Sequence, residues 1–81
     1  MTTINYNNKK MKLPFEVKSH SSAMVKRTNP LSGESTTLPG FAAAVYDVVI
    51  GSEALQDWDK HRKGLDWFSR NFPKQYMVLL D

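Results

Sequence analysis

Apolar and polar residues alternate most clearly over residues 12–18. Leu13, Phe15 and Val17 would face one side and the residues between them the other, which predicts a half-buried strand. Pro14 has no backbone N–H to donate, so we expect this strand at the edge of a sheet.

The segment TNPLSGES predicts a tight turn between two further strands. Asn29 can bond the backbone of the turn, Pro30 presets its own φ, and Gly33 can adopt the positive φ that closes a bulged hairpin. We therefore expect a strand at about residues 23–28 to pair with a short strand at about residues 34–37.

Helical periodicity follows, first at about residues 38–55 and then from Asp57 to Asn71. Thr37 and Asp57 are suitable N-caps for these two helices. The first helix is apolar almost all round, which predicts a central position between the sheet and the second helix. Glycine costs about 1 kcal/mol relative to alanine inside a helix, so we expect Gly51 to mark a close backbone crossing.

The last apolar run, YMVLLD at residues 76–81, is short and predicts a strand buried on both faces. The element order is then ββ(β)ααβ. We expect one small α+β domain over residues 12–81, with a mostly antiparallel sheet of three or four strands packed on two helices. Residues 1–11 are polar and are expected to form a flexible N-terminal arm.

Composition narrows the class of protein. The chain has 81 residues, of which 41% are hydrophobic, enough for one small domain with a real core. It contains no cysteine, which excludes disulfides and thiolate metal sites. The N-terminus lacks the apolar run of a signal peptide, and the most apolar stretch is too short to span a bilayer. We expect a soluble, cytoplasmic protein with no membrane contact, no metal and no other cofactor.

The net charge of +3 is unevenly distributed. Residues 1–30 have a net charge of +5, residues 31–56 contain three anions and no cation, and residues 57–81 have a net charge of +1. Many domains without nucleic-acid partners share such a mild basic bias, so the charge alone is weak evidence for one.

The second helix combines aromatic and basic residues. Five of its residues follow a 3-4-3-4 spacing that predicts a stripe facing the core: Trp58, His61, Leu65, Phe68 and Phe72. Trp67 lies almost opposite this stripe, with Lys60, Lys63 and Arg70 within two turns. An outward tryptophan among cations suits a protein partner or nucleic acid. The alternative is that the N-terminal arm or the rim of the sheet covers it.

The pattern offers no catalytic constellation. Three i, i+4 pairs, Asp59–Lys63, Arg62–Asp66 and Asp66–Arg70, indicate surface ion pairs and not an acid/base pair. No Gly-rich phosphate loop, nucleophile elbow or HExxH motif is present. We therefore predict that the protein is not an enzyme and has no catalytic residues, with His61 a hydrogen-bonded residue of the core.

Two binding functions remain. The first is a non-enzymatic binding protein that uses a protein–protein interface or forms a homodimer, with these candidate residues: Trp67, Lys60, Lys63, Arg70, Met77 and Leu79. Met77 and Leu79 would share one exposed face of the C-terminal strand. The alternative is a nucleic-acid-binding module in which the arm contributes phosphate contacts, with these candidates: Lys9, Lys10, Lys12, Lys63, Trp67 and Arg70.

Three stretches, TNPLSGES…LPGFAAAVYD, GLDWFSRN and the final YMVLLD, resemble small uncharacterised proteins encoded by bacteriophages. The resemblance covers residues 27–81 and contains no diagnostic motif. It implies an accessory role such as host-factor inhibitor, replication helper or minor virion component, and it assigns no site residue.

Overall fold

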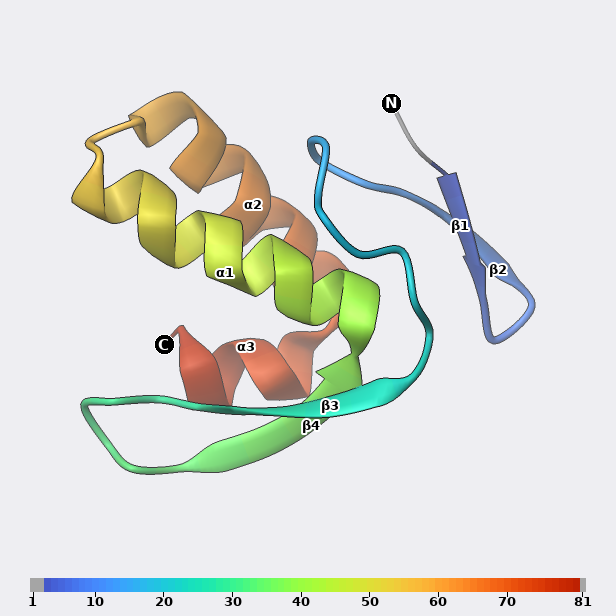
Figure 1. Cartoon of the computed structure of the whole chain (residues 1–81), viewed down its shortest axis with the longest axis horizontal. Helices are drawn as coiled ribbons and strands as arrows, with labels where there is room; N and C mark the ends of the chain where they lie inside the picture. Colours follow the sequence, from blue (N-terminus) through green and yellow to red (C-terminus); the bar gives the residue numbers. More distant parts are fainter. Residues whose placement is uncertain (1–2, 81) are drawn as a thin grey trace.

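A computed structural model describes residues 3–80 of the chain. Within this range the elements are β1 (Thr3–Tyr6), β2 (Lys9–Lys12), β3 (Met24–Thr28), β4 (Ser35–Pro39), α1 (Gly40–Ala54), α2 (Trp58–Asn71) and α3 (Pro73–Leu79). The fold is α+β, but the strands form two separate antiparallel hairpins in place of one sheet, and the order is ββββααα (Figure 1). Residues 1 and 2 of the expected arm and Asp81 of the expected C-terminal strand lie outside the described residues.

Residues 3–12, nearly all of which we assigned to a flexible arm, form the β1–β2 hairpin. Its two-residue turn consists of Asn7 and Asn8, which have φ values of 52° and 61°. Positive φ at both positions is typical of a type I′ turn, in which asparagine is a favoured residue. Ile4 and Met11 are paired across the hairpin and are both buried, so this segment is part of the core.

The strand expected at residues 12–18 ends at Lys12, and the prediction is wrong beyond that residue. The following segment is irregular, yet its alternation still determines burial. Leu13 is buried, and Phe15 and Val17 pack partly buried against the core. The pattern therefore identified the inward side chains correctly, although no neighbouring strand pairs with them.

The same irregular segment caps α1 with its backbone. The Gly40 N–H donates to the Ala23 carbonyl at 2.8 Å, and the Phe41 N–H donates to the Ser21 carbonyl at 2.9 Å. These bonds satisfy two of the amides that a helix leaves unpaired at its start. The expected N-cap, Thr37, lies instead within β4, and no side chain caps α1.

The hairpin predicted around TNPLSGES is confirmed. β3 and β4 pair antiparallel, with Thr28 opposite Ser35. The Asn29 Oδ1 atom accepts from the Leu31 N–H at 2.9 Å, and the Gly33 N–H donates to the Asn29 carbonyl at 2.8 Å. Gly33 has a φ of 79°, the left-handed conformation that its position was predicted to require.

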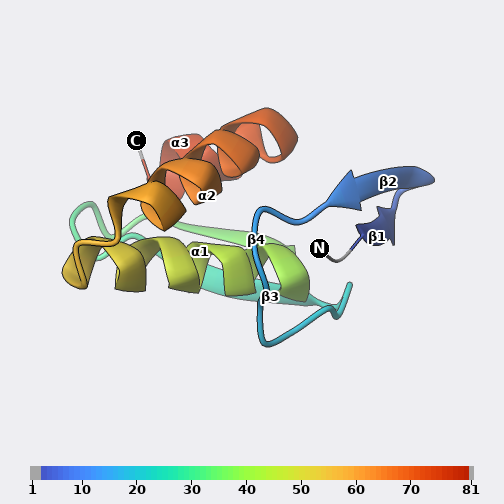
Figure 2. The ribbon, with the colours of Figure 1, turned by 90° about the horizontal axis from the view of Figure 1, so that it is seen from above.

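α1 contacts α2, β3 and β4, which confirms its predicted central position (Figure 2). The closest approach lies at Gly64 of α2, where an added Cβ would overlap Cγ2 of Val49. At Gly51, where we expected a close crossing, a Cβ would meet no atom within 4 Å, so that prediction is wrong. Asp57 caps α2 with its side chain, as predicted.

The segment that we expected to be a buried C-terminal strand is the helix α3. Pro73 occupies its first turn, where a fixed φ suits the helix and the missing N–H has no partner to lose. Tyr76, Leu79 and Leu80 recur at helical spacing, and Leu79 is buried. A helix satisfies its backbone groups internally, whereas a buried strand would have needed neighbouring strands to pair with.

An aromatic cluster joins the elements at the centre of the fold. The ring of Phe41 lies 5.5 Å from that of Tyr6, 6.1 Å from Phe72 and 6.4 Å from Trp67, measured between centroids. These four rings come from β1, α1, α2 and the residue after α2. The N-terminal hairpin and the helices therefore share one core.

Two glycines in neighbouring helices should respond oppositely to the same substitution. Gly64→Ala should destabilise the fold by about 1–3 kcal/mol, because the methyl group has no space against Val49. Gly51→Ala should stabilise it by up to about 1 kcal/mol, because the position is open and alanine favours the helix. Urea denaturation of both variants measures the difference, and equal effects would contradict the proposed crossing point.

Gly33→Val should destabilise the protein by about 1 kcal/mol or more, because a β-branched residue resists positive φ. A Cβ at this position meets no atom within 4 Å, so the cost is conformational and not steric. Gly33→Asn is the matched control and should cost less, since asparagine tolerates this conformation. Thermal unfolding monitored by circular dichroism gives the comparison, and a valine variant as stable as the wild type would argue against the turn.

Candidate functional site

The two tryptophans of α2 have the opposite environments from those that the sequence suggested. Trp67 is only 7% exposed, and its ring centroid lies 5.6 Å from that of Phe72 and 5.9 Å from that of Phe68. Trp58, predicted to face the core, is 53% exposed and contacts the ring of His61 edge-on at 5.7 Å. The predicted outward tryptophan is therefore part of the core.

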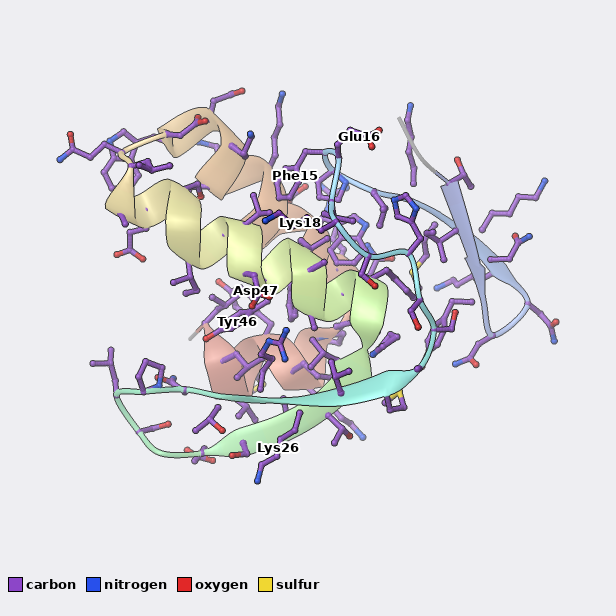
Figure 3. All side chains as sticks on the ribbon, in the orientation of Figure 1. Phe15, Glu16, Lys18, Lys26, Tyr46 and Asp47 are labelled. Atoms are coloured by element: carbon purple, nitrogen blue, oxygen red, sulfur yellow. The ribbon has the colours of Figure 1, made fainter. Side chains whose placement is uncertain are left out.

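The irregular segment after β2 explains why Trp67 is buried although the sequence suggested that it is exposed. Pro14 lines the same surface pocket as Trp67. The ring of Phe15 lies 3.2 Å from the point that a Cβ atom added to Gly64 would occupy (Figure 3). This segment therefore covers a second side of α2, in addition to the side that packs on α1. The buried arc widens to include Trp67, while Trp58, at the first residue of α2, stays largely exposed.

The cations around Trp67 lie at the rim of an open pocket of about 340 Å³. Lys63 pairs with Asp59 and Arg70 pairs with Asp66, each at 3.2 Å, which confirms two of the three predicted i, i+4 pairs. The third is wrong, because Asp66 pairs with Arg70 and not with Arg62. Both pairs are largely solvent-exposed, so each contributes only a few tenths of a kcal/mol. Since Trp67 is buried behind them, its ring has no free face on which a base could stack.

The other predicted contact residues are dispersed. Lys60 is exposed near the start of α2, Met77 is exposed on α3, and Leu79 is buried in the core. The shared exposed face that we expected for Met77 and Leu79 does not exist, because residues two apart on a helix point about 200° apart. The structure therefore does not assemble the expected set into one surface.

The lysines of the N-terminal segment occupy the β1–β2 hairpin. Lys10 and Lys12 lie opposite Asn5 and Thr3, on the face of the hairpin away from the buried Ile4–Met11 pair. Lys9 is exposed beside the turn. Of the residues predicted to bind nucleic acid, the three lysines therefore lie on one basic hairpin. Lys63 and Arg70 lie on α2, far from these lysines in the sequence.

Large apolar side chains are exposed at the other end of the molecule. Leu31 of the β3–β4 turn is 96% exposed and Leu55 after α1 is 82% exposed, while Ile50 and Trp58 are about half exposed. Figures 1 and 2 place the β3–β4 turn and the α1–α2 turn at the same end, opposite the β1–β2 hairpin. We call Leu31, Ile50, Leu55 and Trp58 the apolar end.

A groove of about 310 Å³ opens at the apolar end between the β3–β4 turn, α1 and α3. Its lining is mostly apolar and includes a single charged side chain: Asn29, Pro30, Leu31, Tyr46, Ile50, Glu53, Leu79 and Leu80. Tyr46 lies on the side of α1 that faces α3 (Figure 3). Burial, followed by the neighbouring carboxylate of Asp47, raises the pKa of the Tyr46 phenol, which keeps it neutral at physiological pH.

Asn29 holds the walls of this groove together. It is buried, its Nδ2 donates to the Val78 carbonyl of α3 at 3.0 Å, and its Oδ1 accepts from the Leu31 N–H. The Asn29 side chain thus accepts a hydrogen bond from the backbone of the turn and donates one to the backbone of α3. The groove is preformed by these contacts, because its walls are bonded to one another without a ligand.

The charged side chains near the groove are acidic. Glu53 lines it, and Glu34 lies at the base of the turn, where its carbonyl accepts from the Asn29 N–H at 2.8 Å. Asp47 is neutralised by Arg27, whose Nε and a terminal nitrogen bond the two carboxylate oxygens at 3.1 Å and 3.0 Å. This hydrogen-bonded pairing also raises the pKa of Arg27.

His61 is hydrogen-bonded, as predicted, but it is half-buried and not part of the core. Its Nδ1 lies 3.0 Å from the Val49 carbonyl, which can only accept, so Nδ1 carries the proton. The Ser52 hydroxyl donates to the same carbonyl at 2.8 Å and lies 3.5 Å from Nδ1. Since neither group accepts the other's proton, this pair is not arranged for nucleophilic catalysis.

Residues 3–80 contain no group of three or more histidine, aspartate or glutamate side chains placed to hold a metal ion. In the same range, no helix has the length and apolar character that crossing a membrane requires. Comparison with family models, curated proteins and solved structures finds no match to this chain. Any functional inference must therefore come from its own surface.

Sequence reasoning missed the apolar end, although two signals for it were present. Leu31 is a large apolar residue at the tip of a predicted turn, where polar residues are usual. Ile50 made α1 apolar on its reverse side, and we took that to mean burial on both sides. Trp58 gave no signal, because it matched the spacing of the core stripe.

The two tryptophans should differ in both stability and fluorescence. Trp67→Ala should cost about 3–5 kcal/mol, because it removes a buried ring from the aromatic cluster, whereas Trp58→Ala should cost less than about 1 kcal/mol. Trp67→Phe and Trp58→Phe leave one tryptophan each for acrylamide quenching. The protein that retains Trp58 should be quenched readily and the one that retains Trp67 weakly. The reverse order would contradict the buried position of Trp67.

Proposed function

We propose that this protein is a non-enzymatic binding protein that recognises another protein through the apolar end. The observation that carries the proposal is the exposure of Leu31, Ile50, Leu55 and Trp58 at one end of a chain of 81 residues. Leu31 and Ile50 line one groove and Leu55 lines a second pocket beside the same helix. Exposed apolar patches tend to mark binding surfaces. Tryptophan in particular is enriched among the residues that dominate binding energy.

The chemistry around the groove favours a protein over a nucleic acid or a membrane surface. Phosphate backbones and anionic lipid surfaces attract lysine and arginine, and the groove is lined by neither, although Lys60 lies beside Leu55. Glu34 and Glu53 would repel both kinds of surface. An apolar surface with acidic neighbours instead suits a polypeptide that supplies apolar side chains and compensating cations.

Nucleic-acid binding by the β1–β2 hairpin is the second candidate. It is favoured by Lys10 and Lys12, which share the outward face of a well-defined hairpin, with Lys9 beside them. Three lysines can contribute phosphate contacts, but the expected stacking on Trp67 is lost because that ring is buried. This activity would depend strongly on salt, unlike an apolar protein interface.

The proposal agrees with the accessory role that the resemblance to bacteriophage proteins implies. A host-factor inhibitor, a replication helper and a minor virion component all act by binding another macromolecule. None of these roles requires a catalytic centre. The identity of the partner is left to experiment.

Capture from a cell lysate with two matched double variants tests the proposal. Leu31→Asp with Leu55→Asp should remove the captured proteins, because it places charges in the apolar end, while leaving the fold stable since both side chains are more than 80% exposed. Lys10→Ala with Lys12→Ala at the opposite end is the control and should capture the same proteins as the wild type.

Nuclease treatment and a salt series complete this test. The captured proteins should persist after nuclease treatment and change little with salt. Capture that survives the leucine variants but is lost with the lysine variants, or with nuclease, would reject the apolar end and favour the basic hairpin.

A further inference from the structure

The groove at the apolar end is small and has the apolar lining that suits side chains of a partner. Its volume of about 310 Å³ is near the lower limit for small-molecule pockets, which span about 300–1,000 Å³. Leu31 and Ile50 form an exposed apolar rim, and the buried Leu79 lies between the walls. One or two large apolar side chains inserted here would be desolvated by residues that are already fixed in place.

The walls of the groove favour an inserted helix over an added strand. They consist of side chains from α1 at i, i+4 and i+7, namely Tyr46, Ile50 and Glu53, and of side chains from α3 and the turn. A strand partner needs an open backbone edge to pair with, whereas an amphipathic helix places its apolar face between side-chain walls. The geometry therefore matches the helix-in-groove mode of recognition.

The acidic charge of the groove favours a partner that carries positive charge. Glu53 lies in the last turn of α1, where the helix dipole is negative and no basic residue compensates it. It makes no ion pair with any residue in the range 3–80. A cation from a partner would relieve this unfavourable position.

We infer that the groove between the β3–β4 turn, α1 and α3 receives the apolar face of a cationic amphipathic helix. Leucine-type side chains of that helix enter between Ile50, Leu31 and Leu80, and its lysines or arginines lie over Glu53. This inference rests on the proposed function and adds to it the partner's secondary structure and charge.

A pair of synthetic peptides tests the inference directly. One is a helix of leucine and lysine about 18 residues long, sufficient for helix formation, with leucines at i, i+3, i+4 and i+7. The other has the same pattern with glutamate in place of lysine. The leucine–lysine peptide should bind about tenfold more tightly, with amide chemical-shift changes at Leu31, Ile50 and Glu53 in heteronuclear NMR spectra.

Three variants locate the site. Ile50→Ser should weaken binding of the leucine–lysine peptide about tenfold, because it removes an apolar wall. Glu53→Lys should weaken it about fivefold and should strengthen binding of the leucine–glutamate peptide. Met77→Ser removes an exposed apolar side chain outside the groove and should leave both affinities unchanged. Dispersed NMR spectra of each variant verify that it is folded.

Several results would overturn the inference. Equal binding of both peptides would reject the selection of charge, and unchanged affinity in Ile50→Ser would place the peptide elsewhere. Self-association in sedimentation experiments that Ile50→Ser abolishes would make a second copy the occupant. If neither peptide binds while lysate capture still requires Leu31 and Leu55, the inference fails and the proposed function stands. Capture that ignores those leucines rejects the proposed function itself.

Discussion

The arrangement of the other elements depends on the contacts of the Phe41 ring. It is fully buried at the start of α1, and it touches Tyr6 of the N-terminal hairpin as well as Trp67 and Phe72. Its backbone N–H is bonded to the Ser21 carbonyl. One residue therefore places the hairpin, the irregular segment after it and α2 relative to α1, through both its side chain and its backbone.

Features with a local cause could be predicted from the sequence. The β3–β4 turn depends on Asn29 and Gly33, and the start of α2 depends on Asp57, and each of these acts on neighbouring backbone. The ion pairs of Lys63 and Arg70 also join residues one helical turn apart. In these cases the residues that determine the structure are only a few positions apart, so their pattern is visible in the chain.

Features decided by distant contacts could not be predicted in this way. The conformation of residues 76–79 depends on distant contacts: they form part of the helix α3, which packs beside β4, and Gln75 Nε2 donates to the Thr37 carbonyl of that strand. The orientation of Trp67 depends on Pro14 and Phe15, which approach α2 from a segment about fifty positions earlier. Distant contacts also decide which residues of the candidate site are exposed. The predicted residues had suitable chemistry, but tertiary packing determines which of them reach the surface.

The β1–β2 hairpin and the apolar end are two surfaces of different chemistry at opposite ends of the molecule (Figure 1). Lys9, Lys10 and Lys12 are exposed on the hairpin, whereas Leu31 and Leu55 are exposed at the other end. The buried Phe41 cluster belongs to neither surface. Asn29 bonds the β3–β4 turn to α3, so the walls of the groove at the apolar end are held by contacts within the chain itself.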